Sequence, residues 1–374
     1  MLDCDWLAST VKNEWKKLQT AFSIIGHLSS EIGLGHAARN IAHSAIDSEI
    51  PTRLVDMPLK GRSGIDEFSL VCERYTPGHL NFLVCGIHQA GKIYDVIDAA
   101  GLGKYNIIYP FWELEKIPKS VVSALNRYDE VIAPSDFLAR ALGRQLTRSI
   151  KTISLPVKIP GTVSGNSRVD GVMRVFTALD FDSYVQRKNP LASVAAFQLA
   201  FPDRSEKVEL VIKVRGKNDG GVRRALYSAC VDDPRISLVD RMLSQPEMDS
   251  LKSKINVYLS LHRAEGFGLG PAEALAAGKI VVATDYGGSQ DFINHQTGFP
   301  IDFEMVRLKK GDYLYWNDQF WAEPSLKSAA QALRHVSENY ANALSRADTG
   351  RAWMLRNNAF SVAGESLSRI LPSL

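Results

Sequence analysis

Cysteine is scarce in this sequence and never stands in a pattern that could hold a metal. The four cysteines, Cys4, Cys72, Cys85 and Cys230, are scattered along 374 residues without a CxxC pair. Disulfide scaffolds are dense in cysteine, and zinc sites need ligand pairs at short spacing. We therefore expect neither a disulfide framework nor a zinc site, and the reducing cytosol is the favoured compartment.

Long apolar runs and a large excess of charge are also missing. No apolar stretch approaches the ~20 residues that a membrane span needs, and Asp3 and Asp5 stand where a signal peptide would be basic. The 44 basic and 41 acidic side chains leave a net charge of +3, too even a balance to predict nucleic-acid binding. The sequence thus predicts a cytoplasmic protein that is neither exported nor integral to a membrane and that binds no nucleic acid.

The length and the pattern of apolar runs predict two α/β domains. A chain of 374 residues exceeds what one core usually holds. In the first half, apolar runs alternate with helical or polar segments, which is typical of a parallel, doubly wound sheet. The strands expected there are residues 21–25, 81–85, 105–108 and 130–132. The alternation restarts after residue 170, with strands at 173–179, 208–214, 255–261 and 280–284 and helices at 190–201 and 272–277.

The stretch between these two patterns is the best linker candidate. Residues 155–170 hold two prolines and two glycines and show no apolar periodicity. We therefore place the boundary near residue 165, with a first domain of residues 1–165, a second of residues 166–355 and a terminal helix in 356–374. Open α/β sheets bind ligands at the carboxyl ends of their strands, so the cleft between two such domains is the expected ligand site.

Two carboxylates mark the most informative segment. Glu265 ends a predicted strand, and Glu273 follows it beyond a glycine turn and Pro271, in the first turn of a predicted helix. Glycines let a backbone approach a ligand closely, and a helix N-terminus directs its N–H groups at a diphosphate. The two carboxylates can accept hydrogen bonds from sugar or ribose hydroxyls. The segment therefore predicts a clamp for a polyol and a phosphate.

The spacing from Glu265 to Glu273 is E-x7-E, and the residues around it are LHRAEGFGLGPAEALAAGK. In both features the chain resembles the family 4 retaining glycosyltransferases of GT-B fold, whose donor-site block has this form. The resemblance is strong over residues 176–299 and weak in the first domain. It implies two Rossmann-like, doubly wound domains that face a central cleft, with a terminal helix that crosses back to the first domain.

The resemblance also implies which residues hold the donor. Glu265 would contact the transferred sugar, and Glu273 would hold the ribose hydroxyls. Backbone contacts to the sugar and phosphate would come from Gly266, Phe267, Gly268 and Leu269.

Basic residues for the donor diphosphate are expected after the strand at 173–179. Arg187 and Lys188 fit that role, since a fixed cation stabilises the charge that grows on the leaving diphosphate. Ser183 can donate a further hydrogen bond to a phosphate. Lys213 is either another cation of the site or merely a surface lysine, and the resemblance places Leu243 near the nucleobase.

Asp180 and Asp182 spell DxD, the metal-binding pattern of the other large glycosyltransferase fold. The surrounding chain is not of that fold, and GT-B enzymes generally need no metal for the donor. We therefore expect no metal and no cofactor, with the nucleotide sugar as co-substrate.

A glycine loop is expected in the first domain. The GLG sequence that ends at Gly35 matches the family's N-terminal glycine loop, which closes over the donor phosphate and the acceptor. A dehydrogenase fingerprint would need a third glycine, where this chain has Ala38. His36 and Arg39 either face the cleft or cap the following helix.

Further acceptor-side candidates follow the strands at 81–85 and 105–108. Trp112 can stack on a sugar face, and Glu113 can orient or partly deprotonate an acceptor hydroxyl. The alternative is an aromatic residue and a carboxylate in an ordinary loop. His88 is either another cleft residue or a structural histidine.

The segment 136–151 is amphipathic and carries Arg140, Arg144, Arg148 and Lys151. It could lie on an anionic membrane, as a lipid-linked acceptor at the inner membrane face would require. The alternative, which we favour, is a helix that packs on the sheet.

The leading hypothesis is a retaining transferase that moves a hexose from a nucleoside-diphosphate sugar to a hydroxyl of a glycan or lipid-linked glycan. No dedicated nucleophile is visible, so positioning and charge stabilisation would carry the reaction. A nucleotide-sugar epimerase of the same architecture would need a catalytic histidine that we cannot locate. A non-catalytic nucleotide-sugar-binding module would keep the clamp without turnover.

Overall fold

The computed structural model describes residues 22–59, 61–62, 72, 80–100, 103, 105–163, 167–217 and 219–371. Cys4 and the first residue of the strand predicted at 21–25 lie outside these ranges. The chain divides into two compact units. One contains the described residues up to Lys158 together with those from Asn357 onward, and the other is Ile159–Arg356. We predicted the domain boundary near residue 165, which lies outside the described residues. The observed division falls after Lys158.

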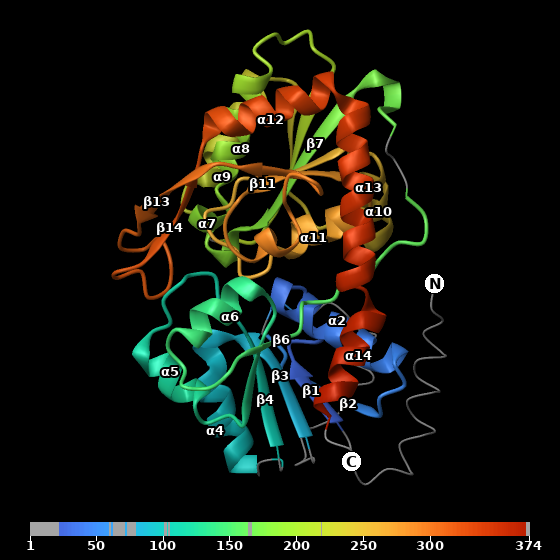
Figure 1. Cartoon of the computed structure of the whole chain (residues 1–374). Coiled ribbons are helices and arrows are strands. Elements are labelled where there is room, and N and C mark those ends of the chain that lie inside the picture. The colour runs from blue at the N-terminus through green and yellow to red at the C-terminus, as the bar shows by residue number, and fades with distance from the viewer. Residues whose placement is uncertain are drawn as a thin grey trace. The chain divides into compact units, whose positions relative to one another are not determined.

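The first unit is a parallel sheet of six strands in the order β2-β1-β3-β4-β5-β6 (Figure 1). Its strands are β1 Phe22–Gly26, β2 Thr52–Asp56, β3 Leu80–Gly86, β4 Tyr105–Phe111, β5 Glu130–Ala133 and β6 Lys151–Thr152. Its helices are α2 Gly33–Asp47, η2 Ile87–Gln89, α4 Ala90–Ala100, α5 Lys119–Leu125, α6 Asp136–Gly143 and α14 Phe360–Ile370. Right-handed crossovers that leave β1 and β3 in opposite directions place α2 and α4 on opposite faces of the sheet.

The second unit has another parallel sheet of six strands, in the order β12-β11-β10-β7-β8-β9, and a separate antiparallel hairpin of β13 and β14. Its strands are β7 Met173–Asp180, β8 Val208–Arg215, β9 Ile236–Val239, β10 Val257–Ser260, β11 Ile280–Thr284, β12 Phe299–Ile301, β13 Phe303–Arg307 and β14 Phe320–Pro324. Its helices are η3 Val169–Gly171, η4 Phe181–Ser183, α7 Val185–Lys188, α8 Pro190–Ala200, α9 Val222–Asp232, α10 Gln245–Ser253, α11 Leu269–Ala276, η5 Gly288–Asp291, α12 Leu326–Glu338 and α13 Tyr340–Asn357.

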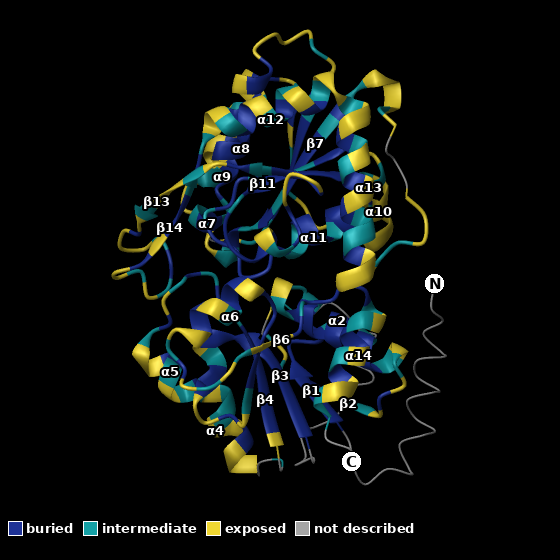
Figure 2. Cartoon of the chain, in the orientation of Figure 1, coloured by how far each residue is buried: buried dark blue, intermediate teal, exposed yellow. Residues whose placement is uncertain are grey.

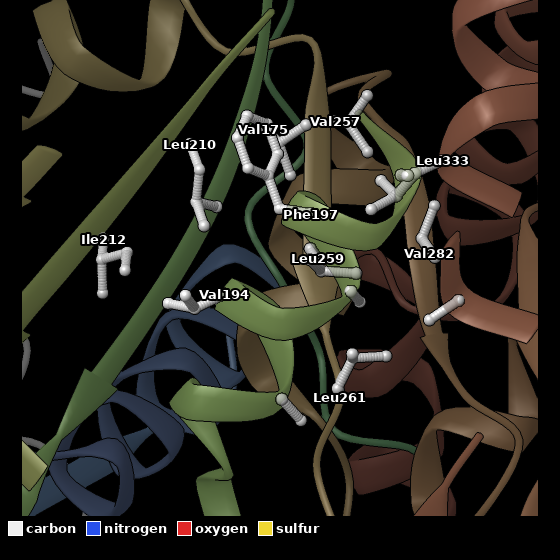
Figure 3. Packing of buried hydrophobic residues seen from close by; sticks show 14 of the residues in the cluster. Val175, Val194, Phe197, Leu210, Ile212, Val257, Leu259, Leu261, Val282 and Leu333 are labelled. Atoms are coloured by element: carbon white, nitrogen blue, oxygen red, sulfur yellow. The ribbon is translucent and has the colours of Figure 1, made fainter. Parts of the chain in front are cut away.

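The central strands are buried on both faces, which is why their sequences are runs of apolar residues without alternation. All seven residues of β3 and all five of β11 are buried (Figure 2). On one face of the second sheet, Phe197 of α8 packs with Val175 and Leu210 of the strands and Leu333 of α12 (Figure 3). These cores fix the strand ends from which the site is built.

The predicted fold class is confirmed, since both halves are parallel α/β units. The strand predicted at 280–284 is β11, and the other predicted strands match described strands to within a few residues. The helix predicted at 272–277 begins earlier, at Leu269, and the hairpin of β13 and β14 was not predicted.

The segment 136–151 forms the short helix α6 and the edge strand β6, with a turn between them. Ser135 caps α6 by accepting a hydrogen bond from the Leu138 amide at 3.2 Å. The apolar side chains of Phe137, Leu138, Ala141, Leu142 and Leu146 are buried. Packing within the unit is therefore the alternative that the structure shows. Over the described ranges, no helix combines the length and the apolar character that crossing a bilayer requires.

The last helix, α14, belongs to the first unit and packs along α2 (Figure 1). The Phe360 ring stacks on His43 of α2, with 5.6 Å between ring centroids. Gly364 faces the backbone of α2, where any side chain would meet the Ser44 carbonyl oxygen and the Ser48 hydroxyl. The glycine thus permits the close helix pair.

This contact can be tested through Gly364. A Cβ at this position would lie 2.6 Å from the Ser44 carbonyl oxygen, and closer still to the Ser48 hydroxyl. In an open helix, Gly→Ala stabilises by about 1 kcal/mol. Here overpacking should dominate, so we expect Gly364→Ala to lower the free energy of unfolding by about 1–3 kcal/mol. Urea denaturation measures this, with Ser361→Ala at an exposed position of α14 as the control. A more stable Gly364→Ala variant would contradict the contact.

Candidate functional site

The second sheet changes direction between β7 and β10. From β7 the chain proceeds outward to β8 and β9, and from β10 it proceeds the other way to β11 and β12. At such a switch point the loops after the two central strands separate and leave a crevice at their carboxyl ends. Lys188 follows β7 and Glu265 follows β10. The topology therefore brings together two segments that are distant in the sequence.

The carboxylate of Glu265 is the centre of this site. It is only 7% exposed. The Nζ of Lys188 donates a hydrogen bond to its Oε1, and Nη1 of Arg187 lies 3.1 Å from its Oε2. Burial alone would raise the pKa of Glu265, but the charges of Lys188 and Arg187 outweigh it and lower the pKa to about 2. Glu265 is therefore ionised across the physiological range.

The turn around Glu265 is held by the loop after β11. The Gly288 amide donates a hydrogen bond to the Glu265 carbonyl oxygen at 2.8 Å. A Cβ on Gly288 would lie 2.6 Å from Cα of Phe267, and one on Gly287 would overlap the Glu265 carbonyl. Gly287 also has φ 88°. Two glycines are thus needed here because two loop backbones are in direct contact.

His262 also helps to hold this turn in place. Its ring is fully buried, its Nδ1 lies 2.9 Å from the Ser260 hydroxyl and its Nε2 lies 2.9 Å from the Tyr286 carbonyl oxygen. Burial lowers the pKa of His262, although the nearby Glu265 carboxylate opposes that shift. The neutral ring, with Nε2 donating to Tyr286, fits both contacts. His262 is therefore a structural link between β10 and the loop after β11.

Helix α11 begins at this turn, with Gly268 as its N-cap in the left-handed region at φ 93°. Its N-terminal N–H groups make it suited to an anion. The helix starts at Leu269, so Glu273 stands in its second turn and not, as predicted, in its first. Lys252 of α10 lies 3.3 Å from Oε2 of Glu273. Glu273 is partly exposed and has a cation beside it.

Arg187 and Lys188 differ more than the sequence indicates. Arg187 is 5% exposed and donates to the carbonyl oxygens of Ala264 at 2.8 Å and Ser183 at 3.4 Å, besides its pair with Glu265. Its Nη1 and Nη2 are thus directed at protein groups under the turn, which favours a role in positioning Glu265 over the predicted direct contact with a diphosphate. The Lys188 side chain is 25% exposed and stands at the edge of the pair.

Lys213 is not a surface lysine. It is buried at the end of β8, and its Nζ donates to the carbonyl oxygens of Val214 and Arg241, each at 2.8 Å. Burial lowers the pKa of Lys213. Lys213 thus fixes the loop between β9 and α10, in which Leu243 is half-buried. The hydroxyl of Ser183 donates to the Asp180 carbonyl oxygen at 2.8 Å.

Asp180 and Asp182, the aspartates of the DxD sequence, accept hydrogen bonds that hold the loop after β7 in place. Asp180 accepts from Nε of Arg215 and from the Asp182 amide, each at 3.0 Å. Asp182 accepts from the Lys217 amide at 3.1 Å. Within the described part of the chain, no group of three or more histidine, cysteine, aspartate or glutamate side chains could hold a metal ion.

Gly35 lies inside helix α2, which begins at Gly33, so the predicted glycine loop before the helix is corrected. A Cβ on Gly35 would lie 2.5 Å from the His27 carbonyl oxygen, so this glycine lets the loop after β1 pack on the helix. Arg39 donates to the carbonyl oxygens of Leu28 at 2.7 Å and Ser30 at 3.1 Å, and so secures the same loop. His36 is half-buried on α2.

Trp112 is a core residue. It is 1% exposed, and its indole N–H donates to the Lys116 carbonyl oxygen at 3.1 Å. The interpretation that it stacks on a sugar is therefore wrong. Glu113 is half-buried beyond the end of β4 and lies near His88. Partial burial lowers the pKa of His88, while the Glu113 carboxylate opposes that shift and His27 adds to it.

His27, which directly follows β1, was not among the residues predicted for the site. It is 3% exposed. Its Nδ1 lies 2.5 Å from the Met57 carbonyl oxygen, and its Nε2 lies 3.2 Å from the amide nitrogen of Gln89. The first sheet also changes direction between β1 and β3. His27, Gln89 and His88 thus stand at the switch point of the first unit, a position that strand order would have indicated.

Comparisons with known proteins agree with this architecture. The model of the family described as Glycosyl transferases group 1 matches residues 239–307. A lipopolysaccharide core biosynthesis mannosyltransferase, LpcC of Rhizobium leguminosarum bv. viciae, is 34% identical over 113 residues, which are 28% of this chain and 30% of that protein. The match thus spans less than a third of that relative's length.

Two solved structures extend the comparison to nearly the whole chain. HepE of Anabaena, in complex with UDP and glucose, has a TM-score of 0.70 at 13% identity and covers 95% of this chain and 100% of its own. Sucrose-phosphate synthase from Thermosynechococcus elongatus has a TM-score of 0.69 at 13% identity and covers 94% of this chain and 98% of its own. These likenesses confirm the predicted GT-B fold.

The depressed pKa of Glu265 predicts a specific loss of stability in acid. Its carboxyl titrates near 4.5 when unfolded and near 2 when folded, so its contribution is complete above about pH 4.5 and is lost as pH falls through about 2. Glu265→Gln removes the negative charge opposite Arg187 and Lys188, so we expect the free energy of unfolding at pH 7 to fall by about 3–5 kcal/mol. The pH dependence in that window should also flatten.

Denaturation with urea at a series of pH values measures both effects. Asp318→Asn is a matched control, because it removes a carboxylate paired with Arg307 where both side chains are well exposed. Exposed pairs contribute about 0–1 kcal/mol, so this variant should change little. Equal stability of wild type and Glu265→Gln at pH 7 would show that the buried pair is not as described.

Proposed function

We propose that this chain is a retaining glycosyltransferase that moves a hexose from a nucleoside-diphosphate sugar to a hydroxyl of a glycan or lipid-linked glycan. The observation that carries the proposal is the buried, ionised Glu265, held by Lys188 at the switch point of the second sheet. A carboxylate suits sugar hydroxyls, and a cation beside a helix N-terminus suits a diphosphate. The likeness to HepE, solved with UDP and glucose, supports this reading.

Each residue of the donor site has a separate role in this proposal. Glu265 accepts hydrogen bonds from hydroxyls of the transferred sugar, and Arg187 positions it from below. Lys188 and the start of α11 hold the diphosphate. Glu273, with Lys252 beside it, accepts from the ribose hydroxyls, and the loop containing Leu243 lies against the base.

The reaction needs no protein nucleophile. The bond from the anomeric carbon to the diphosphate breaks, and the acceptor oxygen forms its bond to that carbon on the same face. The acceptor proton passes to an oxygen of the leaving diphosphate. Negative charge grows on the diphosphate during this step, so Lys188 binds the transition state more tightly than the ground state.

The acceptor is assigned to the first unit. Glu113 and His88 follow the ends of β4 and β3, where polar groups can orient a hydroxyl. We also propose that the donor is used without a metal ion. Asp180 and Asp182 are engaged by Arg215 and by backbone amides, which supports their role in shaping the loop and not in binding a cation.

Lys188→Ala should lower kcat by about 10²–10³-fold, because it removes charge stabilisation at the leaving group. Glu273→Ala should instead weaken donor binding with little change in kcat, since ribose contacts act equally on ground and transition states. Steady-state kinetics in EDTA, together with calorimetry of donor binding, separates the two effects. An unchanged kcat for Lys188→Ala would remove this lysine from the mechanism, and Mn²⁺-dependent transfer would restore the DxD interpretation.

Stereochemistry tests the function directly. An α-linked donor should give an α-linked product, because the acceptor attacks on the side that the diphosphate leaves. The coupling constant of the new anomeric proton, measured by NMR, reports the linkage. A β-linked product would require a base opposite the leaving group. Glu113 would then change from an orienting residue to the catalytic base, and the retaining assignment would be abandoned.

A further inference from the structure

The short helix that carries Lys188 is bounded by two residues in an unfavourable backbone conformation. Helix α7 is only four residues long, Val185–Lys188. Tyr184 precedes it at φ 61°, and Asn189 follows it at φ 51°, both in the left-handed region. Asparagine tolerates that region, but a tyrosine does so only at a cost, because its Cβ approaches the following carbonyl. Such residues persist where surrounding contacts hold them, and they concentrate at functional sites.

The hairpin of β13 and β14 supplies contacts at both ends of α7. In the connection between the two strands, the buried Tyr313 packs edge-on against Tyr184, with 4.7 Å between ring centroids. At the other end, Glu323 of β14 accepts a hydrogen bond from Asn189 at 3.5 Å. Figure 1 shows β14 beside α7. The hairpin thus touches both left-handed residues.

Arg263 connects this hairpin to the two segments of the donor site. Its Nε and Nη2 donate to the two carboxylate oxygens of Glu323, at 2.6 and 3.0 Å. Its Nη1 donates to the Gln186 carbonyl oxygen at 2.8 Å. Its backbone amide donates to the Arg187 carbonyl oxygen, and its own carbonyl accepts from Ala322 of β14. One residue therefore joins β14, α7 and the turn that holds Glu265.

The Arg263–Glu323 pair is better suited to orienting its two side chains than to stabilising the folded protein. The side chains are 22% and 40% exposed, and pairs with that much solvent contribute little to the free energy of unfolding. A bidentate arginine–carboxylate contact nevertheless fixes both groups in one plane. Displacement of a catalytic group by a fraction of an ångström to one ångström is enough to slow an enzyme strongly.

We propose that Tyr313, Glu323 and Arg263 form a hairpin clamp, which positions Lys188 against Glu265 for transfer. The clamp residues act through α7 and are positioning residues, since the groups that contact substrate are Lys188 and Glu265. The inference rests on the proposed glycosyltransferase function. It assigns a role to the β13–β14 hairpin, which stands outside both parallel sheets.

The test uses the full chain with Glu323→Gln and Tyr313→Ala, two variants at independent contacts. We expect kcat at saturating donor to fall about tenfold or more in each, as for a modest misplacement of a catalytic group. The affinity for the intact UDP- or GDP-sugar that the wild type uses should fall much less than kcat, because Lys188 acts mainly on the charge that grows on the diphosphate as it leaves. Circular dichroism melting verifies that each variant is folded, and two sites keep the test valid if one variant is not.

Asp318→Asn is the matched control, since it removes from the same hairpin a well-exposed carboxylate that pairs with Arg307 of β13. It should keep the wild-type kcat. Unchanged kcat in both clamp variants, or an equal fall in Asp318→Asn, would overturn the clamp. A loss of affinity for the intact donor equal to the loss of kcat would also overturn it, as general damage to the site. If wild-type protein transfers no sugar from UDP-glucose, GDP-mannose or related donors, the proposed function fails and the clamp with it.

Discussion

The ion pairs of the buried Glu265 carboxylate with Arg187 and Lys188 constrain how the second unit can fold. A buried ionised carboxyl costs several kcal/mol unless opposite charges and hydrogen bonds compensate for it. Both compensating cations, Arg187 and Lys188, come from α7, so the loop after β7 must meet the turn after β10. The two strands are neighbours in the sheet, which makes this meeting possible. Burial of one charge thus ties two distant segments together.

The surrounding features follow from that requirement. The loop after β11 lies directly against the turn that carries Glu265, an approach that Gly287 and Gly288 permit and the buried His262 secures. The loops after three strands that are neighbours in the sheet, β7, β10 and β11, then converge around one carboxylate. Because the Arg187 side chain is 6% exposed and the Lys188 side chain 25%, the carboxylate has an inner structural cation and an outer one at the edge of the site.

The sequence predicted the central strands and singled out Glu265, but it did not predict which groups the surrounding side chains contact. Strands buried on both faces, such as β11, are continuous apolar runs and are visible without tertiary information. Glu265 stands in a motif with a local mechanism. By contrast, Arg187 is buried by a partner 77 residues away, and nothing local distinguishes it from Lys188. The prediction for Trp112 was wrong for the same reason. An aromatic residue after a strand gives the same sequence pattern whether its side chain is buried or exposed.

The hairpin of β13 and β14 is hidden from sequence for a different reason. Both strands are only five residues long, and β13 has no buried residue, so the hairpin lacks the long buried apolar runs of the central strands. Its position is set by Glu323 and Arg263, which are 60 residues apart, and by aromatic packing onto a tyrosine with positive φ. Strained backbone is costly to keep, and the contacts that keep it are concentrated on α7. The least predictable part of this unit is therefore the part that directly supports its outer cation.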